Sequence, residues 1–164
     1  MAATDECRAR ILGQDQAAVQ AIAAFKAGLT HVTQYRAAER PLLTNWQALL
    51  DYLHVDMAHL AVERFRVLHL NTRNMLIRDD VITEGTIDHT PIHPREVVRR
   101  AIELGSAAII LVHNHPSGDP SPSRSDIDVT RNVAEVGKRL GIAVLDHVIV
   151  GASGHVSLRA QGLI

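Results

Sequence analysis

Apolar positions along the chain first follow a helical period and later fall into short runs and alternations. Six apolar residues between positions 8 and 29 recur at helical spacing among many alanines and predict a helix: Ile11, Leu12, Val19, Ile22, Phe25 and Leu29. Residues 30–43 are polar and include Pro41, so they are expected to form a connection. Thr44 is a suitable N-cap for a second helix that carries Trp46, Leu49, Leu50 and Leu53.

The remainder of the chain alternates between strand-like and helix-like segments. Strands are expected at 65–70, 75–77, 81–87, 107–112, 142–145, 148–150 and 155–158. Helices are expected from Pro94 to Leu104 and from Ile127 to Leu140, each stopped by a following glycine. The uninterrupted apolar run 107–112 predicts a strand buried on both faces. This alternation predicts an α/β fold preceded by a helical N-terminal segment.

Composition excludes several function classes. The chain of 164 residues is 46% hydrophobic but only 3% aromatic, which indicates one domain with an aliphatic core. Its formal net charge of -1 lacks the basic excess that is typical of proteins binding nucleic acid through phosphates. Cys7 is the only cysteine, which rules out an internal disulfide and a thiolate zinc site. No apolar run reaches the ~20 residues of a membrane span, and no signal pattern starts the chain, so we expect a cytoplasmic protein without a membrane partner.

Candidate chemistry gathers where the buried strand 107–112 ends. His113 and His115 are separated by one residue, so on an extended chain their side chains point the same way. A loop with three prolines follows, and Asp126 lies in the first turn of the next helix. Two imidazoles and one carboxylate suit zinc, with the fourth tetrahedral position left open for water. These three residues are therefore the candidate metal ligands.

Structural alternatives exist for each of these residues. Both histidines are compatible with hydrogen-bonded positions in a core or turn. Ser123 and Asp126 have the spacing of a capping box, in which an acid is favoured at the helix start. By spacing alone, metal binding and a structural role are comparable interpretations.

Several segments resemble a known family. The pattern His113-x-His115, ten residues and Asp126, with Ser123 three before the acid, is similar to the signature of JAMM (JAB/MPN+) metalloproteases. The whole run 113–126 (HNHPSGDPSPSRSD) looks like the bacterial RadC family (UPF0758), as do 85–87 (GTI), 94–98 (PREVV) and 145–151 (LDHVIVG). The resemblance covers residues 44–164, and leaves 1–43 as the helical N-terminal segment and connection.

The resemblance implies a fold, a metal and a reaction. It implies a mixed sheet flanked by helices, with a cytidine-deaminase-like architecture, and Zn2+ held by the two histidines and Asp126. It requires an upstream glutamate as general base, for which Glu63 is the best match and Glu84 the rival; an exposed charge at a strand edge is the alternative for Glu63. Ser123 would donate a hydrogen bond to the oxyanion. The implied activity is a zinc metallopeptidase that cleaves a peptide or isopeptide bond in a peptide or protein substrate.

Two further functions stay open. The resemblance also suggests a DNA-repair-associated protein whose metal site is structural or vestigial, because longer RadC-like proteins resemble helix-hairpin-helix proteins at their N-termini. Here only residues 12–17 (LGQDQA) are similar to that motif, and Arg95, Arg99 and Arg100 form a local basic patch. A binding module that retains its metal but has lost catalysis is the third hypothesis. Assembly into a homo-oligomer is compatible with the sequence.

Two details qualify the resemblance. Asn114 stands between the histidines, where deubiquitinating JAMM enzymes carry Ser or Thr, which argues against a ubiquitin-like isopeptide substrate. His147 is interpreted as a structural residue of a strand. The other histidines considered have no evident ligand partners and are assigned to the surface or core: His54, His59, His89 and His93.

Overall fold

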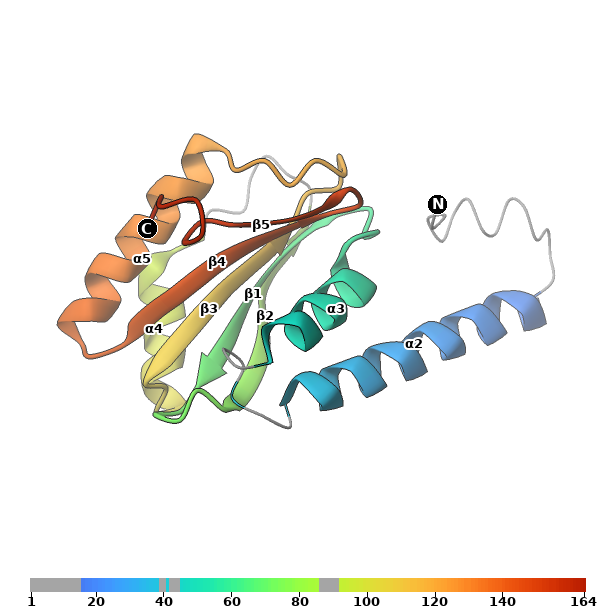
Figure 1. The fold of residues 1–164 in the computed structure, drawn as a ribbon, viewed down its shortest axis with the longest axis horizontal. Coiled ribbons are helices and arrows are strands. Elements are labelled where there is room, and N and C mark those ends of the chain that lie inside the picture. The colour runs from blue at the N-terminus through green and yellow to red at the C-terminus, as the bar shows by residue number, and fades with distance from the viewer. Residues whose placement is uncertain (1–15, 39–40, 42–44, 86–91) are drawn as a thin grey trace.

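The computed structural model describes residues 16–38, 41, 45–85 and 92–164, and its centre is a five-stranded sheet in the order β2-β1-β3-β4-β5 (Figure 1). The strands are β1 (Glu63–Leu70), β2 (Leu76–Gly85), β3 (Ala108–Asn114), β4 (Ala143–Gly151) and β5 (Gly154–Ser157). Strands β3 and β4 run parallel, whereas the other neighbouring pairs are antiparallel. The predicted mixed sheet is therefore confirmed.

Helices cover both faces of this sheet. They are α2 (Gln16–Ala38), α3 (Trp46–Met57), α4 (Pro94–Glu103) and α5 (Arg124–Arg139). Helix α3 lies on one face, α4 and α5 lie on the other, and α2 contacts α3 on its outer side (Figure 1). The α/β fold class and the helical N-terminal segment are both confirmed.

Two hydrophobic layers hold the sheet between its helices. Leu53 and Met57 of α3 pack with Leu68 and Ile110 on one side of the sheet. On the other side, α4 and α5 pack against Phe65, Val67, Ile109 and Leu111. Every residue of β3 is buried, as its uninterrupted apolar run predicts. The last residues of strand β3 are therefore anchored in a part of the sheet that is buried on both faces.

The first helix extends further than the sequence predicts. The expected connection begins at residue 30, but α2 continues through Gly28 to Ala38. A glycine costs a helix interior only about 1 kcal/mol relative to alanine, so it weakens this helix without ending it. The expected apolar positions Ile22, Phe25 and Leu29 are exposed, because α2 lies outside the sheet layers.

Other boundaries shift by a few residues. The expected strands 75–77 and 81–87 join in one strand, β2, up to Gly85, and residues 86–87 lie outside the described residues. The expected strands 142–145 and 148–150 are likewise one strand, β4, because polar residues between apolar runs do not interrupt ladder hydrogen bonding. Asn45 occupies the N-cap of α3, and Thr44 lies outside the described residues. Pro94 begins α4 as predicted. In the described part of the chain, no helix is both long and apolar enough to cross a membrane.

Candidate metal centre

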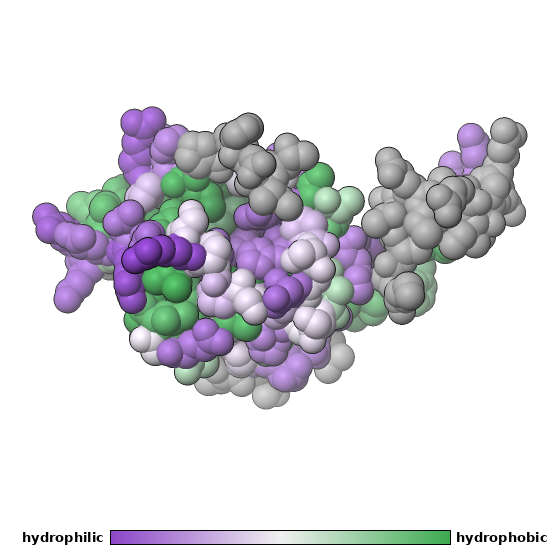
Figure 2. All heavy atoms as spheres, turned by 90° about the horizontal axis from the view of Figure 1, so that it is seen from above, coloured by the Kyte–Doolittle hydropathy of each residue, from purple (hydrophilic) through white to green (hydrophobic). Residues whose placement is uncertain are grey.

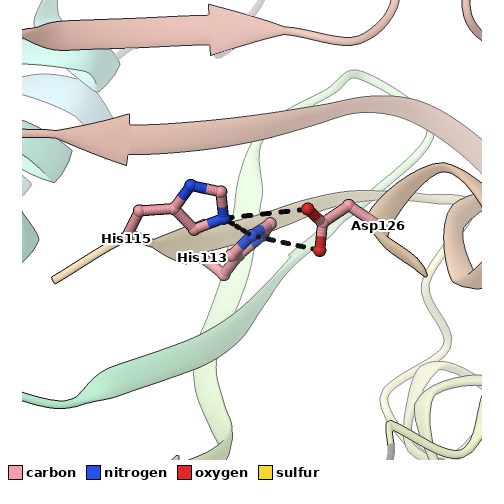
Figure 3. A group of neighbouring side chains, drawn as sticks. All are labelled: His113, His115 and Asp126. Atoms are coloured by element: carbon pink, nitrogen blue, oxygen red, sulfur yellow. Dashed lines mark hydrogen bonds and ion pairs between the residues drawn. The ribbon is translucent and has the colours of Figure 1, made fainter. Parts of the chain in front are cut away.

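Three predicted ligands meet beyond the carboxyl end of β3. His113 is the penultimate residue of β3, His115 is the first residue after the strand ends, and Asp126 lies in the first turn of α5. One potential ligand atom from each lies within 4.8 Å of the other two (Figure 3). The side chain of His113 is 1% exposed, whereas those of His115 and Asp126 are 19% and 16% exposed. One ligand is thus embedded in the core and two border solvent.

The separations between these atoms suit a tetrahedral metal. His113 Nε2 lies 3.0 Å from His115 Nε2 and 3.4 Å from Asp126 Oδ1, and His115 Nε2 lies 3.7 Å from Asp126 Oδ2. Ligand atoms at about 2.0–2.1 Å from a tetrahedral zinc ion are roughly 3.3 Å apart. The three distances bracket that value, so the residues present fit the ion.

The loop between β3 and α5 orients His115. His115 Nδ1 lies 2.8 Å from the carbonyl oxygen of Asp119, which only accepts hydrogen bonds, so Nδ1 carries a proton and Nε2 is the nitrogen that faces His113 and Asp126. The loop packs closely against Gly151, because a Cβ added at Gly151 would overlap the carbonyl oxygen of Gly118. Figure 2 views the edge of the molecule along which this loop runs, and hydrophilic to near-neutral residues cover the middle of that face. The middle of the face on this side of the molecule is therefore mostly polar.

The start of α5 orients Asp126 through a capping box. Ser123 Oγ accepts a hydrogen bond from the Asp126 amide at 3.2 Å, and Asp126 Oδ2 accepts from the Ser123 amide at 2.7 Å. The Ser123 hydroxyl also donates to Asp126 Oδ2 at 2.6 Å. The capping role foreseen for both residues is confirmed. It does not compete with metal binding, because carboxylate oxygens accept several partners.

Electrostatics in the centre favour a carboxylate facing imidazoles. Burial alone would raise the pKa of Asp126, but the ion pair with His115, the charge of His113 and the hydrogen bonds from Ser123 hold that pKa well below its usual range. The carboxylate of Asp126, 3.7 Å from Nε2, raises the pKa of His115 despite partial burial. Burial lowers the pKa of His113 to about 4, although Asp126 opposes the shift. His113 is therefore a neutral imidazole at physiological pH.

Glu63 shares this electrostatic environment. It begins β1, which lies beside β3 so that Phe65 is opposite His113. Burial raises the pKa of Glu63, the charge of His115 lowers it, and Asp126 raises it further. Its rival Glu84 is instead committed to Arg64, with 3.0 Å between Arg64 Nη2 and Glu84 Oε1. Of the two glutamates, Glu63 is the one coupled to the centre.

Asn114 secures the backbone on both sides of Glu63. Its Oδ1 accepts a hydrogen bond from the Arg64 amide at 2.9 Å, and its Nδ2 donates to the Val62 carbonyl at 3.1 Å. Asn114 itself is 1% exposed. Sequence reasoning noticed this residue only as a departure from related enzymes. The sequence did contain a sign of a positioning role, because Asn114 lies between two candidate ligands at the end of a strand expected to be buried.

His147 and Thr130 lie behind His113. His113 Nδ1 is 2.8 Å from His147 Nε2, and His147 Nδ1 is 2.5 Å from Thr130 Oγ1. Thr130 Oγ1 also donates to the carbonyl oxygen of Asp126. The ring of Phe65 packs edge-on against His147. The sequence assignment of His147 as structural did not foresee its contact with a candidate ligand, because the contact joins two different strands.

The remaining candidate residues do not join the centre. The three arginines of the predicted basic patch all pair with acids: Arg95 with Glu96, Arg99 with Glu96 and Glu103, and Arg100 with Asp80 and Glu103. His54 and His59 contact each other, and His93 occupies the N-cap of α4. Cys7, His89 and residues 12–15 of the hairpin-like segment lie outside the described residues.

Comparisons with known proteins agree on one family. The family model described as "RadC-like JAB domain" matches residues 43–163. A UPF0758 protein of Rhodobacter capsulatus is 46% identical over 154 residues, which cover 94% of this chain and 72% of the relative. A UPF0758 protein of Ruegeria pomeroyi is 44% identical over 156 residues, which cover 95% and 70%. The names of both relatives state a family and no activity.

Proposed function

The chain belongs to the RadC-like JAB domain family, and we propose that it acts as a zinc-dependent metallopeptidase that cleaves a peptide or isopeptide bond. The observation that carries this proposal is the convergence of His113 Nε2, His115 Nε2 and the Asp126 carboxylate at distances suited to one tetrahedral ion. Three protein ligands leave a fourth position for water, which is the arrangement of a catalytic site rather than a structural one.

Glu63 supplies the proton-transfer group. Zinc, when bound, lowers the pKa of its water ligand to about 7 and so supplies hydroxide at neutral pH. Glu63 lies beside the three ligands without being grouped with them, and its pKa is raised by burial. A carboxylate with a raised pKa is a suitable base for that water and a suitable acid for the leaving amine. Asn114 holds the backbone that carries Glu63 in place.

Ser123 has two roles in this proposal. Its hydroxyl donates to Asp126 Oδ2 in the structure and so orients a metal ligand. The same hydroxyl turns toward the carbonyl oxygen of a substrate and donates a hydrogen bond to the oxyanion of the tetrahedral intermediate. The capping bond from the Asp126 amide is kept in both states, because it uses a lone pair of Oγ and not its proton.

The DNA-associated alternative has less support. Each arginine of the predicted basic patch is paired with an acid, which removes most of its attraction for phosphate. A binding module that retains its metal but has lost catalysis is compatible with the three ligands but gives no role to Glu63, whose pKa is shifted by burial and by its proximity to His115 and Asp126. The hydrolase is therefore the function that the geometry supports best.

Metal content of the purified protein tests the ligand set. We expect about one zinc per chain in the wild type after dialysis, and its loss in His115→Ala. His155→Ala is the matched control, because His155 is an exposed histidine on β5, outside the candidate centre. Wild-type protein that retains no zinc after metal is supplied would overturn the proposal.

A peptide and isopeptide substrate screen then tests the reaction. We expect Glu63→Gln to retain zinc but to lose at least a hundredfold in turnover, since a general base contributes about 10²–10⁴ in rate. Glu84→Gln serves as the matched control and is expected to keep its activity. Equal turnover in wild type and Glu63→Gln would exclude Glu63 as the base.

A further inference from the structure

We infer that His147 and Thr130 are positioning residues of the metal centre, which hold the proton of His113 on Nδ1 and thereby turn the lone pair of Nε2 toward the ion. The inference rests on the proposed function, because it explains how one of the three ligands is kept ready for metal. It assigns a role to two buried polar residues that the hydrolytic mechanism itself does not use.

Burial forces these residues to satisfy one another. His113 is 1% exposed, and His147 and Thr130 are 0% exposed. Their polar atoms form a continuous series, with His113 Nδ1 2.8 Å from His147 Nε2 and His147 Nδ1 2.5 Å from Thr130 Oγ1. Each of these contacts must contain one proton, because two facing lone pairs would repel in a buried site.

Thr130 determines which atom donates and which accepts in each hydrogen bond of the series. Its hydroxyl has a single proton, and the carbonyl oxygen of Asp126 can only accept. That proton therefore goes to Asp126, in the back-bond that a helical threonine commonly makes to the carbonyl four residues earlier. Thr130 Oγ1 must then accept a hydrogen bond, and the proton in that contact comes from His147 Nδ1.

The remaining protons follow from what the two rings contact. The ring nitrogens of His147 face Thr130 Oγ1 and His113 Nδ1, so a second proton on this fully buried ring would have no carboxylate partner, and a ring that donates from Nδ1 keeps a lone pair on Nε2. His147 Nε2 accordingly accepts from His113 Nδ1. Because Nδ1 is the donor in that contact, Nε2 is the nitrogen of His113 that has the lone pair, and it points at His115 and Asp126. The opposite direction would place a proton on Nε2, where it would block metal binding.

This arrangement links two ligands through one helix turn. Asp126 supplies a carboxylate to the centre, while its backbone carbonyl anchors the series that ends at His113. A shift of the first turn of α5 would therefore disturb both ligands together. Partners behind a metal-ligating histidine usually fix its tautomer and ring orientation, and their loss costs about 10–100-fold in metal affinity or activity.

Imidazole nitrogen spectra of the metal-free wild type test the proton placement directly. In ¹⁵N-labelled protein near pH 7.5, we expect the His113 ring to show a protonated Nδ1 and an unprotonated Nε2. This measurement needs neither metal nor substrate. A His113 ring protonated on Nε2 would overturn the inference.

Zinc affinity in paired variants tests the consequence. Thr130→Val preserves the shape of the side chain but removes the hydroxyl, and we expect a 10–100-fold loss in zinc affinity by chelator competition. Thr130→Ser retains the hydroxyl and is expected to restore affinity to within about threefold of the wild type. If Thr130→Val does not fold, the same contrast is made with His147→Leu and His147→Gln, because the glutamine oxygen can accept from His113 Nδ1.

The outcomes separate this inference from the proposed function. A folded Thr130→Val variant with wild-type zinc affinity would overturn the positioning role. Wild-type protein with His113 protonated on Nδ1 but without affinity for zinc would support the proton placement and refute the zinc hydrolase. Loss of affinity in Thr130→Val together with rescue by Thr130→Ser would support both.

Discussion

Replacement of Asn114 by alanine tests how the candidate base is held. The variant removes the bond that Asn114 accepts from the Arg64 amide and the one that it donates to the Val62 carbonyl. A net hydrogen bond contributes about 0.5–1.5 kcal/mol, and an unpaired buried group costs about 1–3 kcal/mol. Val62 and Arg64 are only partly buried, so water can reach the freed groups and the lower values apply.

We therefore expect Asn114→Ala to lower the free energy of unfolding by about 2 kcal/mol, a change of roughly 30-fold in the folding equilibrium. Turnover should fall further than zinc affinity, because the freed backbone carries Glu63 and not the metal ligands. Urea denaturation measures the free energy of unfolding, chelator competition measures zinc affinity, and cleavage of a peptide substrate found in the screen measures turnover.

The matched control is Asn132→Ala, since Asn132 is exposed on α5 and its substitution should change stability by no more than about 0.5 kcal/mol. An Asn114→Ala protein as stable as this control would show that the two bonds do not hold the strand. Equal losses of zinc affinity and turnover would show that Asn114 supports the ligands instead of the base.

Two other changes probe the start of α5 and the interior. Ser123→Ala should cost about 1 kcal/mol in unfolding free energy because the N-cap is lost, whereas Ser123→Gly should cost only a few tenths of that. If the hydroxyl also binds an oxyanion, both variants lose turnover alike, and a loss that follows stability alone would contradict this role. Burial lowers the pKa of His69 to about 4, so between pH 6.5 and pH 4 the unfolded chain binds more protons at this residue and stability falls as pH falls. When urea unfolding is compared at pH 7 and pH 4.5, we expect the free energy of unfolding of His69→Gln to fall by about 2–3 kcal/mol less than that of the wild type. Identical losses in the two proteins would mean that folded His69 takes up its proton at the usual pH.

Much of the fold was predictable because it is encoded in local patterns. The apolar run 107–112 within the third strand, Pro94 at a helix start and the capping box at Ser123 each depend on residues close together in sequence. The candidate ligands were predictable for the same reason, since two side chains with one residue between them share a side of an extended chain. Local pattern was misleading at the end of α2, where a glycine and polar residues suggested a connection that the helix spans.

The sequence by itself determined which residues carry the candidate chemistry, but the tertiary structure decided which partners surround them. The resemblance ranked Glu63 above Glu84, but the physical distinction came from the placement of β1 beside β3 and the pairing of Glu84 with Arg64. The contacts of His147 with His113, and of Asn114 with the backbone on either side of Glu63, join segments 34 and 50 to 52 residues apart. Such contacts depend on strand order and register. These are set by the packing of the whole sheet between its helices, and no short window of sequence contains that information.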